Sequence, residues 1–86
     1  MTIFEKMEGL GYELMPEHDN IFQKQSVGGV IVTMIFNYNT RSVLGCVYPT
    51  RLIYSNTEVK FINQGLLDLE KDLRTLEGHG ITIERR

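Results

Sequence analysis

The chain has 86 residues and a mass of 9.9 kDa, which is the size of one small domain. Its residues are 42% hydrophobic and 23% charged, so the chain is too apolar for intrinsic disorder and should fold. The net charge of −2 argues against both a general binder of polyanions and a strongly acidic mimic of nucleic acid.

Cysteine content and hydropathy indicate the compartment. The single cysteine, Cys46, cannot form an internal disulfide, which argues against a secreted scaffold held by disulfides. The first residues lack a basic stretch followed by an apolar one, and no apolar run approaches the ~20 residues that span a bilayer. We therefore expect a cytoplasmic protein that is not inserted in a membrane.

The first half of the chain predicts one short helix and several strands. A helix is expected over 2–10, where apolar residues recur at helical spacing. Short strands are expected over 12–15 and 21–26. The residues of 30–36 are β-branched and apolar, and together with 42–48 they predict an antiparallel hairpin. The run 52–54 predicts a further extended segment.

A long amphipathic helix is predicted over 56–77. Ser55 and Glu58 have the spacing of a capping box at its start, and Gly78 follows its end. Residues 81–83 are compatible with a last edge strand or with a loose tail. Apolar residues recur along the helix at alternating steps of three and four, the spacing of a coiled-coil interface. Because three heptads are marginal for a coiled coil, we favour packing of this stripe on the protein's own sheet. These residues are Val59, Ile62, Leu66, Leu69, Leu73 and Leu76.

These elements predict a single α+β domain over 1–86. It would contain a short N-terminal helix, a three- to four-stranded antiparallel sheet, and a long C-terminal helix packed on that sheet. Both faces of the central strand are apolar, so the face that the long helix leaves bare needs a cover. We expect a homodimer through Ile31, Thr33 and Ile35, with coverage by helix 2–10 as the alternative.

The N-terminal residues carry a resemblance. The opening Ile3-Phe4-Glu5-Lys6 and the later Leu10-Gly11-Tyr12, followed by hairpin strands and a capped helix, resemble small uncharacterised proteins of phages, prophages and plasmids of Gram-positive bacteria. The resemblance implies a mobile-element origin, where small proteins act by binding and blocking a host or competitor protein. It implies no catalytic residues.

The residues capable of chemistry have simpler interpretations. His18-Asp19 lies in a predicted turn, and the only other histidine, His79, lies between two glycines, so no metal site is expected. Cys46 is predicted in mid-strand as a small core or interface residue rather than a nucleophile. No phosphate-binding loop or catalytic set is present, so we expect no enzyme and no cofactor.

Two functions remain open. The preferred one is a protein–protein interaction module that binds, and in its sharpest form inhibits, a host or defence protein. The alternative is a nucleic-acid-binding accessory protein that uses the middle of the chain, because residues 21–55 contain basic but no acidic residues. Its contacts would be Lys24, Arg41, Arg51, Tyr38 and Tyr48.

Overall fold

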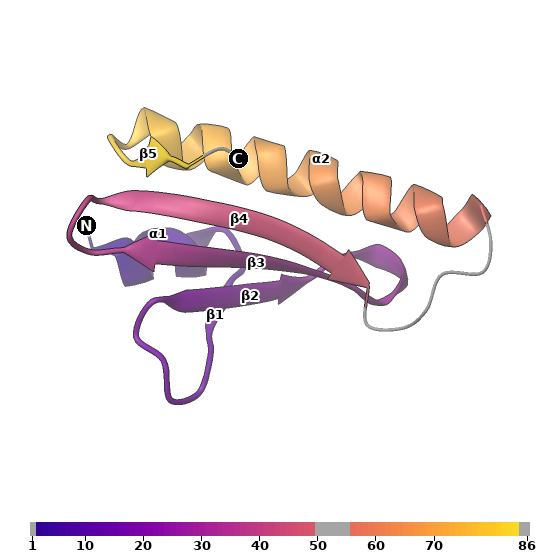
Figure 1. Cartoon of the computed structure of the whole chain (residues 1–86), viewed down its shortest axis with the longest axis horizontal. Helices are drawn as coiled ribbons and strands as arrows, with labels where there is room; N and C mark the ends of the chain where they lie inside the picture. The colour runs from indigo at the N-terminus through magenta and orange to yellow at the C-terminus, as the bar shows by residue number, and fades with distance from the viewer. Residues whose placement is uncertain (1, 50–55, 85–86) are drawn as a thin grey trace.

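The computed structural model describes residues 2–49 and 56–84, without the side chains of 56–58 (Figure 1). The elements follow in the order α1 (Ile3–Gly9), β1 (Glu13–Leu14), β2 (Ile21–Gln25), a 3₁₀ turn η1 (Val27–Gly29), β3 (Val30–Asn37), β4 (Ser42–Pro49), α2 (Asn56–Gly78) and β5 (Thr82–Ile83). The predicted α+β architecture is confirmed. The capping box at Ser55 and Glu58 and the extended segment 52–54 lie outside the described residues and side chains.

The five strands form one sheet in the order β1-β2-β3-β4-β5, so the prediction of three to four strands was too low. Strands β1 to β4 are antiparallel, and β5 lies parallel to β4. β5 is parallel to β4 because α2, which connects the two strands, returns the chain to the end of the sheet at which β4 begins. Residues 82–83 thus form an edge strand, and Ile81, which precedes them, is buried.

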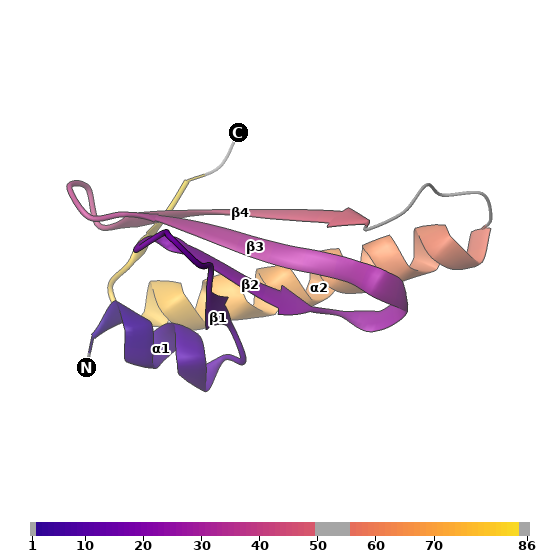
Figure 2. The ribbon, with the colours of Figure 1, turned by 90° about the horizontal axis from the view of Figure 1, so that it is seen from below.

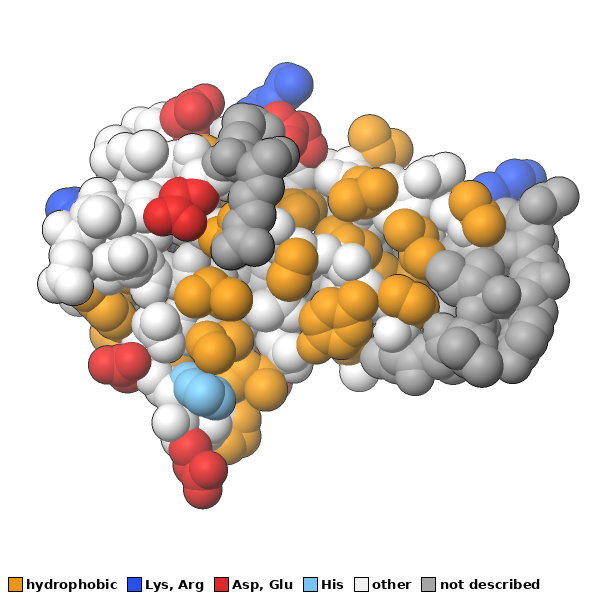
Figure 3. Space-filling view, viewed as in Figure 1, with side chains coloured by type: hydrophobic (Ala, Val, Ile, Leu, Met, Phe, Trp, Pro, Cys, Tyr) orange, Lys and Arg blue, Asp and Glu red, His pale blue; other side chains and the backbone are white. Residues whose placement is uncertain are grey.

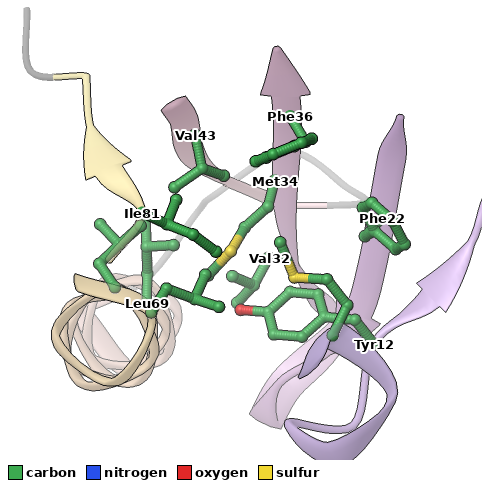
Figure 4. Close-up of a cluster of buried hydrophobic side chains, with 11 residues drawn as sticks. Tyr12, Phe22, Val32, Met34, Phe36, Val43, Leu69 and Ile81 are labelled. Atoms are coloured by element: carbon green, nitrogen blue, oxygen red, sulfur yellow. The ribbon is translucent and has the colours of Figure 1, made fainter. Parts of the chain in front are cut away.

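Both helices pack on the same face of the sheet, as the view in Figure 2 shows. Met7 of α1 and Leu69 of α2 belong to one buried cluster with residues of β2, β3 and β4 (Figure 4). The alternative that helix 2–10 covers the second sheet face is therefore wrong. A short loop connects α1 to β1, so α1 stays close to β1 and β2. There its apolar residues pack into the same core as those of α2. That buried cluster consists of Met7, Tyr12, Phe22, Val32, Met34, Phe36, Val43, Leu69, Leu73, Leu76 and Ile81.

Glycines set how closely α2 approaches the sheet. A Cβ atom on Gly45 of β4 would lie 2.6 Å from Cδ1 of Leu69, and one on Gly65 of α2 would lie 2.9 Å from Val30 and 3.0 Å from Val47. Each glycine therefore makes room for a side chain of the facing layer. The mid-helix position of Gly65, which is unfavourable by propensity alone, is explained by this close approach.

The apolar stripe of α2 divides into two parts. Leu69, Leu73 and Leu76 are buried against the sheet, which confirms that they are core residues. By contrast, Val59 and Leu66 are 45% and 49% exposed, so the N-terminal part of the stripe reaches solvent.

Replacing Leu69 by alanine should lower the free energy of unfolding by about 2–5 kcal/mol, because the site is buried and cannot collapse freely. Urea unfolding followed by circular dichroism measures this change. Leu67→Ala is the matched control, since Leu67 is 65% exposed and its truncation should change stability by less than about 0.5 kcal/mol. Equal effects of the two substitutions would contradict the described packing of α2.

Gly65→Ala should destabilise the protein, although alanine in a helix normally gains about 1 kcal/mol over glycine. The added methyl would press on the stiff side chains of Val30 and Val47, and overpacking of this kind costs about 1–3 kcal/mol. Gly78→Ala, where a Cβ atom meets nothing within 4 Å, is the control. Thermal melts that rise for both variants would show that α2 lies further from the sheet.

Candidate interaction surface

The sheet face turned away from the helices carries three rows of side chains, which we call the open face. Strand register places Ile21, Ile35 and Leu44 in the first row, Gln23, Thr33 and Cys46 in the second, and Gln25, Ile31 and Tyr48 in the third. These residues alternate along each strand with those that contact the helices. No described helix or strand covers them. The open face is thus a largely apolar surface with a polar row through its middle.

A side-chain contact crosses the open face. Gln23 of β2 donates from Nε2 to the hydroxyl of Tyr48 on β4 at 2.7 Å and to Oγ1 of Thr33 at 3.4 Å. The two long side chains meet above β3, the strand between them. This contact explains why Ile31 and Thr33 are only 9% and 6% exposed although no described helix lies over them.

The predicted interface residues therefore differ in accessibility. Ile35 is 38% exposed, whereas Ile31 and Thr33 are buried within the single chain. In Figure 3, which looks onto this side of the molecule, hydrophobic side chains occupy the middle and charged ones the margin. The exposed part of the open face centres on Ile35 with Leu44 and Cys46 beside it, and Tyr48, 40% exposed, forms its other end.

A shallow groove continues this surface between β4 and α2. Apolar groups of both elements line it, including Leu44 and Cys46 of the strand and Leu66 and Leu73 of the helix. Two carboxylates, Glu70 and Glu84, also border it. The sequence alone did not predict this groove. The apolar stripe of α2 is visible in the sequence, but the exposure of its start at Leu66 and the position of β4 beside it are visible only in the structure.

The described candidates for nucleic-acid contact do not form one surface. Lys24 lies on the helix side of the sheet and is held by Asp72, while Tyr48 lies on the opposite face. Arg41 is exposed in the turn between β3 and β4. The hydroxyl of Tyr38 donates to the backbone carbonyl of Asp19. Arg51 lies outside the described residues.

The best-organised polar cluster joins the N-terminal segment to α2. The carboxylate of Asp72, only 6% exposed, accepts from the Tyr12 hydroxyl at 2.9 Å and from Lys24 Nζ at 2.5 Å. Lys24 Nζ also donates to the carbonyl of Leu10 at 3.0 Å and lies 4.7 Å from the centre of the Tyr12 ring. Burial, and next the bonded Asp72 carboxylate, raise the pKa of Tyr12 well above its usual range. These polar groups bond to one another, so we assign the cluster a structural role.

The other residues singled out for chemistry stay apart. His18 and His79 are exposed, in the turn before β2 and after α2. The described residues contain no group of three or more histidine, cysteine, aspartate or glutamate side chains placed to hold a metal ion. Cys46 is exposed on the open face, so the part of its prediction that placed it in the core was wrong. It is exposed because even-numbered residues of β4 point away from α2.

Comparison of the chain with protein-family models, curated proteins and solved structures finds no match. Among the described helices, none has the length and apolar character needed to cross a membrane.

The Tyr12–Asp72 hydrogen bond should make stability fall at alkaline pH. Tyr12 has a raised pKa in the folded state, so above the unfolded value of about 10 the unfolded chain loses this proton while the folded chain keeps it. Stability should fall by up to about 1.4 kcal/mol for each further pH unit. Tyr12→Phe should remove this part of the slope, as measured by urea unfolding between about pH 9 and about pH 11. An unchanged slope would contradict the buried pair.

Proposed function

We propose that the chain is a small cytosolic protein–protein interaction module of phage or other mobile-element origin. It binds a host or defence protein, and inhibition of that protein is the activity that the resemblance suggests. The observation that supports this proposal is the open face, a central apolar surface on which no described element packs. The proposal assigns the chain no catalytic step.

The chemistry of the open face fits a protein surface as the partner. Ile35 with its row neighbours offers apolar area, while Gln23 in the middle row and Tyr48 at the other end offer hydrogen-bonding groups. Aromatic and aliphatic anchors with a few polar groups are typical of the centres of protein interfaces. Charged side chains at the margin of Figure 3 would form the solvated rim of such an interface.

The nucleic-acid alternative draws less support from the arrangement of its residues. Binding a phosphate backbone needs several free cationic groups on one surface. Lys24 is engaged by Asp72, and Arg41 lies at the turn end of the hairpin rather than beside Tyr48. A second arm of the experiment below nevertheless keeps this alternative open to direct test.

Ile35→Lys should weaken capture of the partner by at least about tenfold, because the new charge would be desolvated in an apolar interface. Tagged wild-type and variant chains are used to capture proteins from bacterial lysate, followed by quantitative mass spectrometry. Leu67→Lys, on the outer side of α2, is the matched control and should capture normally. A partner captured equally by wild type and Ile35→Lys would contradict binding through the open face.

The second arm measures shifts of labelled DNA and RNA at several salt concentrations. The proposal predicts no salt-dependent shift, and no functional effect of Arg41→Glu combined with Arg51→Glu. A shift that this double variant abolishes would instead establish the nucleic-acid function.

A further inference from the structure

We propose that a second copy of this chain pairs with the outer edge of β4, antiparallel to it, about a twofold axis that passes beside Cys46. This assembly uses the strand edge and the groove, whereas the proposed partner binds the open face. Either proposal can therefore fail without the other. It also moves the expected homodimer away from Ile31 and Thr33, which the single chain already buries.

The part of the β4 edge along which no described strand pairs has definite limits. At its start, β5 pairs with Ser42 and Val43, and the backbone amide of Glu84 donates to the carbonyl of Val43 at 2.8 Å. At its end, Pro49 has no amide proton to donate. Between these limits, no described strand lies along the outer side of residues 44–48. This stretch spans about 17 Å, and its middle residue is Cys46.

The backbone amide and carbonyl groups of this stretch point in the directions that pairing with another strand requires. Val43 directs its carbonyl outward to Glu84, and backbone groups of alternate residues point to the same side of a strand, so those of Gly45 and Val47 point outward as well. Antiparallel pairing centred on Cys46 sets Gly45 of each copy opposite Val47 of the other, and all the outward groups find partners. A strand edge with no partner strand among the described residues is a template for another strand.

The side chains of the stretch also suit a twofold axis. Pairing places Leu44 of each copy beside Tyr48 of the other on the open face, and Cys46 beside its own equivalent. Residues 44–48 include no charged side chain, so the strand pairing itself brings no like charges together; the carboxylates of Glu70 and Glu84 border the groove outside this stretch. An isologous contact needs this kind of self-complementary surface.

Strand pairing over five residues is too small to account for the whole interface. A specific interface buries about 1,000 Å² or more in total, so groups outside the strand must contribute. Cys46 lies level with the stretch of α2 between Gly65 and Leu69, because Gly45 faces Leu69 and Val47 faces Gly65. Leu66 lies in that stretch, lines the groove and is 49% exposed. Across the axis, Leu66 would contact Leu66 of the second copy. The interface would then have two layers, one formed by the paired β4 strands and one by the two α2 helices.

Sedimentation equilibrium over micromolar concentrations tests this assembly directly. The expected result is a mass near twice 9.9 kDa that falls towards 9.9 kDa on dilution. Leu66→Lys should weaken the dimer by at least about tenfold while keeping the thermal melt of the monomer, because the site is half exposed in the single chain. Leu67→Lys, the adjacent residue on the outer side of the helix, should leave the dimer intact.

Disulfide formation between the two Cys46 residues reports whether the strands pair in this register. Facing residues of a pair that does not exchange hydrogen bonds have Cα atoms about 4.5 Å apart, within the range that a disulfide can bridge. Diamide should therefore link two wild-type chains, and Leu66→Lys should reduce this linking at equal concentration. Cys46→Ser should still form the dimer but should not be linked.

Three results would overturn the assembly. The first is a monomer at every concentration. The second is a dimer disrupted by Ile35→Lys but not by Leu66→Lys, which would place the contact on the open face. The third is a dimer that loses stability with Leu66→Lys but in which Cys46 is never linked, which would exclude strand pairing centred on that residue.

Discussion

The close approach of α2 to one face of the sheet determines most other features of this protein. Gly45 admits Leu69, and Gly65 admits the side chains of Val30 and Val47, so the two layers interlock at two points. Closely packed layers of this kind exclude water from both surfaces. The same approach brings Asp72 within reach of Tyr12 and Lys24, which fastens the N-terminal segment to the helix. The core and its buried polar cluster thus depend on one interlayer distance.

Because both described helices pack on one face, the other face is shielded from solvent only by its own side chains in the part of the chain that the structure describes. The contact between Gln23 and Tyr48 shields Ile31 and Thr33, but it does not reach the exposed side chain of Ile35. Meanwhile the short β5 covers only the start of β4. The described elements therefore leave two neighbouring surfaces uncovered; our proposals place a protein partner on the open face and a second copy at the strand edge.

The sequence predicted the elements whose signal is local and long. The hairpin of β3 and β4 and the helix α2 follow from hydrophobic periodicity over eight or more residues. The edge strands β1 and β5 are only two residues each: β1 lies within the strand predicted over 12–15, whereas 81–83 stayed open between a strand and a tail, because β5 is defined by its pairing with β4 on the other side of α2 in the sequence. Burial of Thr33 depends on Gln23 and Tyr48, which are far from it in sequence. The groove beside β4 was likewise invisible, because it needs the register of α2 on the sheet.

The central claim is that the described helices cover one sheet face only and that Ile35, on the other face, is exposed to solvent in the isolated chain. Methyl NMR with a soluble paramagnetic agent measures this directly. The account predicts strong relaxation of the Ile35 methyl groups and little relaxation of those of Val32 and Leu69, which lie between the layers. Comparable protection of Ile35 and Val32 in a dilute sample would contradict the account.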